Sequence, residues 1–131
     1  MRIEAWRPVI ARIRTFSLTH SDPNRHNFVR GLDGSMIPVD LHRLGYRPFA
    51  EELVNAVYEY CRKDPPLTQP FLDAYFARAG SAARQSFDES RRFFELLFLI
   101  RKMHRRMEWR SPGENDVNVE QWRRLILTDG P

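Results

Sequence analysis

The sequence contains few of the residues that form covalent cross-links or bind metals. A single cysteine, Cys61, is present among 131 residues, and one cysteine cannot form an internal disulfide. A secreted fold held together by disulfides is therefore excluded. Asp40 and His42, with Asp33 nearby, form at best a weak metal site, because zinc normally takes three or four well-placed ligands. We expect neither a metal nor a cofactor, since the four histidines share no metal-ligand spacing: His20, His26, His42 and His104.

Long apolar runs are also missing. The most apolar stretch, residues 93–100, is apolar at seven of eight positions and is far too short to span a bilayer. The first part of the chain has no apolar segment of the length that a signal peptide needs. We therefore expect a cytoplasmic protein that does not enter a membrane.

Lysine is scarce. Of 21 basic residues only Lys63 and Lys102 are lysine, which leaves 19 arginines against 17 acidic residues and a net charge of +4. Arginine forms bidentate pairs with carboxylates and phosphates. The excess of arginine has two explanations that the sequence leaves open: a compositional bias of the genome, or an anionic partner.

The composition predicts one globular domain over residues 1–131, with 42% hydrophobic and 29% charged residues. We expect a mainly α fold of about five helices around one central buried helix, residues 86–110. Its apolar middle predicts burial on all sides, with Phe94, Leu97 and Ile100 nearly inaccessible. Ser86 and Glu89 match the capping box, which places the start of this helix at Ser86.

Four further helices follow from apolar spacing and from helix-start and helix-stop residues. The first carries an apolar stripe from Trp6 to Phe16, and the second begins at Pro48 and ends before Asp64. The third runs from Thr68 to Gly80, and a last short helix begins at Asn118.

Residues 26–39 have another character and predict a small β-hairpin or extended loop. Asp33 and Gly34 separate two short apolar runs, and Asp-Gly supplies the positive φ angles that a tight hairpin turn needs. Pro38 cannot donate to a ladder, so a strand containing it lies at an edge. We expect the segment that follows to return to the core through Leu41, Leu44 and Tyr46.

No catalytic motif is present. The sequence has neither a nucleophile elbow nor a phosphate-binding loop, and no histidine lies near Cys61 in sequence, so we interpret its thiol as a buried structural group. The adjacent carboxylates at residues 51–52 and 88–89 fall in first turns of predicted helices, where the helix dipole accounts for them. We therefore expect no catalytic residue and no enzymatic activity.

One short resemblance points the other way. Five residues separate Arg14 from His20, in the sequence Arg14-Thr-Phe-Ser-Leu-Thr-His20, which resembles the short motif of HEPN-family ribonucleases. In that family of small helical proteins the arginine and histidine act on RNA phosphate, and the motif lies late in the domain. Here it covers seven residues and lies in the predicted first helix. We interpret Arg14 as a surface residue and His20 as a helix-end residue.

The basic side of the predicted helix 86–110 is the remaining candidate site. It covers about half of the helical projection and consists of Arg91, Arg92, Arg101, Lys102, Arg105, Arg106 and Arg110. The alternative is a solvated face paired with Glu51, Glu52, Glu59 and Asp88. We expect a non-enzymatic interaction protein, an accessory subunit, adaptor or inhibitor that docks on a larger partner. The second hypothesis is a protein that binds nucleic acid through this face. The oligomeric state is not predictable.

Overall fold

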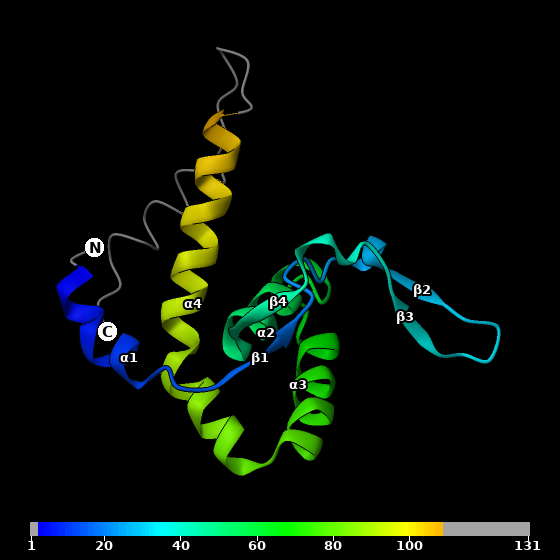
Figure 1. Cartoon of the computed structure of the whole chain (residues 1–131), viewed down its shortest axis with the longest axis horizontal. Helices are drawn as coiled ribbons and strands as arrows, with labels where there is room; N and C mark the ends of the chain where they lie inside the picture. Colours follow the sequence, from blue (N-terminus) through cyan, green and yellow to red (C-terminus); the bar gives the residue numbers. More distant parts are fainter. Residues whose placement is uncertain (1–2, 109–131) are drawn as a thin grey trace.

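The computed structural model describes residues 3–108 and is mainly helical (Figure 1). Residues 14–48, which we call the β part, hold two small antiparallel sheets. No helix in this range combines the length and apolarity that crossing a bilayer requires. In chain order the elements are η1 (Ile3–Trp6), α1 (Arg7–Arg12), β1 (Phe16–Thr19), η2 (Arg25–Asn27), β2 (Phe28–Arg30), β3 (Met36–Pro38), η3 (Leu41–Arg43), β4 (Gly45–Pro48), α2 (Phe49–Glu59), α3 (Pro65–Ala79) and α4 (Ser81–Glu108).

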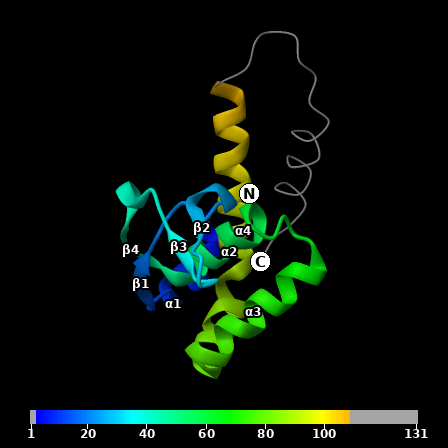
Figure 2. The same cartoon turned by 90° about the vertical axis from the view of Figure 1, so that its right-hand side faces the viewer.

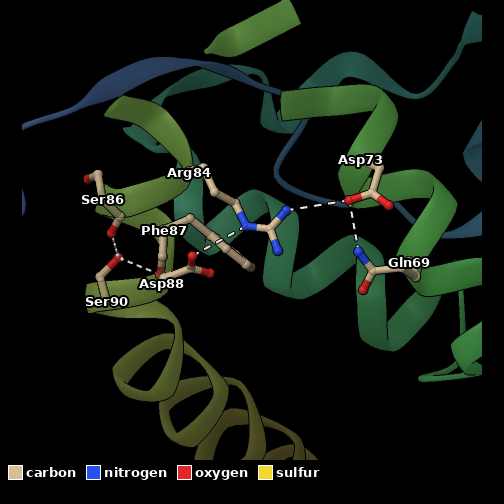
Figure 3. Close-up of polar contacts among 7 residues, drawn as sticks. All are labelled: Gln69, Asp73, Arg84, Ser86, Phe87, Asp88 and Ser90. Carbon is tan, nitrogen blue, oxygen red and sulfur yellow. Dashed lines mark hydrogen bonds and ion pairs between the residues drawn. The ribbon is translucent and has the colours of Figure 1, made fainter. Parts of the chain in front are cut away.

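The longest helix, α4, contacts α1, α2 and α3. Its predicted start at Ser86 is wrong, because the helix begins at Ser81. Gly80, with φ of 87°, separates α3 from α4, and the residues after it are good helix formers that continue into the capping-box sequence. Ser86 therefore lies inside the helix, where its carbonyl accepts a 2.7 Å bond from the Ser90 hydroxyl (Figure 3).

A polar cluster lies at the α3–α4 junction (Figure 3). The Arg84 guanidinium lies 3.3 Å from Asp88 on its own helix and 3.5 Å from Asp73 on α3. Gln69 donates to the same Asp73 carboxylate at 2.8 Å. Asp88, expected to pair with the basic face, is therefore engaged with Arg84. These pairs are exposed, so each contributes little stability.

The core consists of two packed clusters. The larger joins α2, α3 and α4 through Phe49, Leu53, Val57, Leu72, Phe76, Phe87 and Phe94. The smaller joins the N-terminal segment to α4 through Trp6, Leu96 and Leu99. Phe94 is buried as expected, but Leu97 and Ile100 are half-buried. The prediction of burial on all sides is wrong for these residues. On one side α4 packs Phe94 against α2 and α3, and on the other it packs Leu96 against the N-terminal segment, so that Leu97 and Ile100 lie between the two contacts.

The boundaries of the other helices differ from prediction in ways that have local causes. The first helix, α1, ends at Arg12, and Phe16 belongs to β1 instead. The prediction for α2 is close, since it begins at Phe49, directly after Pro48. The third helix begins at Pro65, not at Thr68, because a first-turn proline needs no hydrogen-bond donor. The predicted helix at Asn118 lies outside the described residues.

The predicted hairpin is present as β2 and β3, which pair with Val29 opposite Ile37. Its turn differs from the two-residue turn expected. The Gly34 N–H donates to the Gly31 carbonyl at 3.0 Å, and the Gly31 N–H donates to the Ser35 carbonyl at 2.8 Å. Within residues 31–35 only Gly34 has a positive φ, 84°, which identifies a three-residue loop closed by a glycine bulge.

Two neighbouring leucines test the packing of α4. Leu96 is 1% exposed and Leu97 is half-buried. Leu96→Ala should lower the free energy of unfolding by about 2–5 kcal/mol, because it leaves a cavity in the core. Leu97→Ala, the matched control, should cost less, because partly exposed surroundings leave a smaller void. Denaturant unfolding of both variants measures the difference, and equal losses would contradict the burial seen on α4.

Candidate functional site

The sheet formed by β1 and β4 exposes its apolar side chains. Phe16 pairs with Pro48, and Leu18 pairs with Tyr46. Because alternate residues of a strand point to opposite faces, these four side chains share one face, which we call the outer apolar face. Phe16, Leu18 and Tyr46 are 56%, 58% and 78% exposed. This corrects the expectation that Tyr46, and with it Leu41 and Leu44, would anchor the chain to the core, since all three are exposed.

The opposite face of this sheet is polar and lies toward α2, which contacts both strands. It carries Ser17, Thr19, Gly45 and Arg47, and Thr19 is buried. The Thr19 hydroxyl donates to the Gly45 carbonyl at 3.1 Å. The usual arrangement of a half-covered sheet is therefore reversed, with polar residues inside and aromatic and aliphatic residues outside.

A carboxylate on α2 holds the sheet in this orientation. Glu52 accepts hydrogen bonds from the His20 N–H at 2.9 Å and from the Ser21 N–H at 3.0 Å, at the end of β1. Ser21 has a positive φ of 66°, which turns its N–H toward α2. Burial raises the pKa of Glu52 above its ordinary value, and the two backbone donors oppose that shift. We call this arrangement the Glu52 clamp.

Exposure of apolar side chains extends over the whole β part. Thirteen large hydrophobic side chains are exposed among the described residues, and ten of them lie between Phe16 and Tyr46. Neither core cluster includes a residue from 14–48. Scattered exposed hydrophobics are ordinary, whereas a concentration in one segment is a feature typical of interaction surfaces.

A cleft of about 550 Å³ lies beside this segment, between the η3–β4 connection, α2 and the C-terminal half of α4. Arg101, Lys102 and Arg105 of the predicted basic face line it. Arg43 and Arg47 join them from the β part, and sequence reasoning missed both. Helical periodicity cannot indicate these two arginines, since the β1–β4 pairing brings them to the cleft.

The acids of the cleft neutralise part of its positive charge. Arg101 pairs with Glu51, and Lys102 pairs with Glu59. The described part of the chain offers no ion pair to Arg43, Arg47 or Arg105. The cleft is therefore a mixed-charge surface in which some guanidinium groups stay available for a carboxylate or phosphate.

The remaining predicted basic residues are not placed in this cleft. Arg91 and Arg92 both contact the Glu95 carboxylate, at 2.8 and 3.3 Å. The side chain of Arg106 and the whole of Arg110 lie outside the described residues. The predicted basic face is thus divided into residues that line the cleft and residues engaged along α4.

The other residues considered for chemistry have structural surroundings. Arg14 is exposed before β1, while His20 is buried after β1 with its Nε2 2.7 Å from the Val39 carbonyl. His20 is not at a helix end, because the helix stops at Arg12. Burial raises the pKa of the Cys61 thiol, which makes it less reactive. Within residues 3–108 no three acidic, histidine or cysteine side chains are grouped to hold a metal ion.

Comparison with protein-family models, curated proteins and solved structures finds no match to this chain.

The raised pKa of Glu52 predicts how the stability of the fold depends on pH. The native state keeps the Glu52 proton to a higher pH than the unfolded state, so the contribution of Glu52 to stability is greatest below its ordinary pKa of 4.5 and falls as the pH rises through its native pKa. Glu52→Gln stays neutral and lacks this fall. Denaturant unfolding between about pH 4 and about pH 7 should show the variant gaining stability relative to the wild type as pH rises. A difference that is constant or declines with pH would contradict the buried carboxylate.

Proposed function

We propose that this protein is a non-enzymatic interaction protein that docks on a larger protein partner through the outer apolar face of β1 and β4. The observation that carries the proposal is the orientation of Phe16, Leu18 and Tyr46, which point away from the body while Thr19 is buried on the opposite side of the same sheet. Polar contacts hold this orientation, which supports a role for the exposed face beyond stability.

The composition of the face suits a protein interface. Aromatic side chains are enriched in the cores of such interfaces, and tyrosine is among the residues that most often dominate binding. Covering the face would remove apolar area from water, which stabilises a complex by about 25 cal/mol per Å² before the costs of association. A partner with an apolar patch of similar size is therefore the kind of ligand we expect.

The mixed-charge cleft supports a protein over a nucleic acid. Glu51, Glu52 and Glu59 line the same cleft as Arg43, Arg47 and Arg105. A polyanion following this surface would lie close to three carboxylates, whereas a protein surface can present charges of both signs. Charged groups around an apolar centre then contribute to partner selection and association rate.

Nucleic-acid binding remains the second candidate function. It is favoured by the three cleft arginines that lack an acidic partner among the described residues: Arg43, Arg47 and Arg105. Each phosphate that they contacted would release counterions, so binding would weaken steeply as salt rises.

Capture from the native host with two sets of variants tests the proposal. The double variant Leu18→Ser, Tyr46→Ser should lose the partner captured by the wild type, by at least about tenfold, because it removes two central apolar contacts. The matched control is Leu67→Ser, which changes a leucine of the same exposure class on α3, 55% against 58% for Leu18. It should retain the partner. Unfolding of all variants should match the wild type, since these side chains are exposed.

The charge variant Arg43→Glu, Arg105→Glu distinguishes the two functions. For a protein partner it should alter the association rate and its salt dependence, while capture resists nuclease. For nucleic acid it should abolish binding, and nuclease should remove whatever the wild type captures. Retained capture by Leu18→Ser, Tyr46→Ser together with loss in the charge variant would overturn the proposal in favour of the second function.

A further inference from the structure

The hydrogen-bond pattern of the β2–β3 hairpin leaves the outer edge of β2 open to a further strand. The Val39 N–H donates to the Asn27 carbonyl at 2.9 Å, and the Gly31 N–H donates to the Ser35 carbonyl at 2.8 Å. In an antiparallel pair, bonded and non-bonded residue pairs alternate. The N–H and C=O groups of Val29 therefore bond to Ile37 on β3. Those of Phe28 and Arg30 point outward, away from β3. Among the described residues no hydrogen bond engages these outward groups.

The two edges of the hairpin differ. On β3 the outward positions are Met36 and Pro38, which face Arg30 and Phe28 across the pair. Pro38 has no N–H, so it blocks strand addition on that edge without weakening the hairpin. Proline is a common protection of an edge strand. The outer edge of β2 has no such protection, and its two outward residues each carry a donor and an acceptor.

The geometry points to a second copy of this chain as the occupant of the β2 edge. Two β2 strands related by a two-fold axis through Val29 would place Phe28 opposite Arg30 of the second copy, and Arg30 opposite Phe28 of the second copy. Both members of each pair point outward, so each pair exchanges two main-chain hydrogen bonds. The two hairpins would then form one four-stranded antiparallel sheet.

The side chains of β2 are compatible with this pairing. Val29 would face Val29 of the second copy across the axis, a pair of β-branched residues directly opposite each other. Arg30 would face an aromatic ring and not the like charge of another Arg30. Val29 and Ile37 lie on one face of the hairpin, 50% and 49% exposed, so the four-stranded sheet would join them into one apolar row.

The hairpin projects from the helical body, with its tip pointing away from β1 and β4 (Figure 1). Figure 2, turned by 90°, shows the same hairpin in front of the body. The remaining outer strands would both be β3, whose Pro38 opposes further addition, so assembly would close at two copies. This pairing is independent of the docking proposed for β1 and β4.

A cysteine pair tests the two-fold axis. In the paired strands the two Val29 Cα atoms would lie about 4.5 Å apart, within the range that a disulfide bridges. Val29→Cys should give a disulfide-linked dimer as its main product under mild oxidation. Ile37→Cys is the matched control, with nearly equal exposure on the same face, but three strand spacings of about 4.8 Å separate its two copies. The wild type, whose Cys61 is buried, measures the background. Equal cross-linking of the two variants would overturn the proposal.

Two substitutions at Arg30 test the edge itself. Arg30→Pro removes an outward N–H and leaves the inward ladder intact, as Pro38 does on β3. It should weaken the dimer at least about tenfold in sedimentation equilibrium, because two of the four intermolecular bonds are lost. Arg30→Ala keeps the N–H and should dimerise within about threefold of the wild type. A wild type that stays monomeric at all concentrations, or a dimer unaffected by Arg30→Pro, would overturn the proposal.

Discussion

Two backbone N–H groups that donate to one carboxylate determine how the β part of this protein sits on its helices. The Glu52 carboxylate on α2 accepts hydrogen bonds from the N–H groups of His20 and Ser21, directly after β1. A shift of β1 by one residue would lose these bonds and turn its apolar side chains inward. The clamp therefore holds the orientation in which Phe16 and Leu18 face water. Burial of the carboxylate carries an energetic penalty, seen in its raised pKa, and the fold retains it.

The exposed β part and the buried helical core have different roles. The two core clusters draw on the N-terminal helical segment and on α2, α3 and α4. The segment between residues 14 and 48 adds no residue to them and presents two surfaces, the outer apolar face and the free edge of β2. The charges of the cleft lie beside the first of these, and Glu51 and Glu59 balance two of them by pairing with Arg101 and Lys102. We propose that the helices are the scaffold and that the β part makes the contacts with other chains.

The sequence predicts the features that depend on neighbouring residues. The hairpin around Gly34, the start of α2 after Pro48 and the burial of Phe94 all follow from local spacing. The β1–β4 sheet does not, because its strands are separated by a segment longer than either, and the spacing of Trp6 to Phe16 fits a helix equally well. Tyr46 and Leu44 were expected in the core for a related reason: apolar side chains predict burial, and nothing local shows that they face outward. Arg43 and Arg47 become candidates only through the same long-range pairing, whereas Arg101, Lys102 and Arg105 could be identified from one helix.

The proposed function requires that the exposed face of β1 and β4 binds a protein partner. Hydrogen–deuterium exchange of the free protein and of the complex isolated from the native host tests it most directly, since protection reports where backbone amides are covered or stabilised. We predict that binding slows exchange in β1 and β4, over residues 16–19 and 45–48. Protection confined to residues 101–105 of α4, with β1 and β4 unchanged, would contradict the claim and place the interface on the basic side of the long helix.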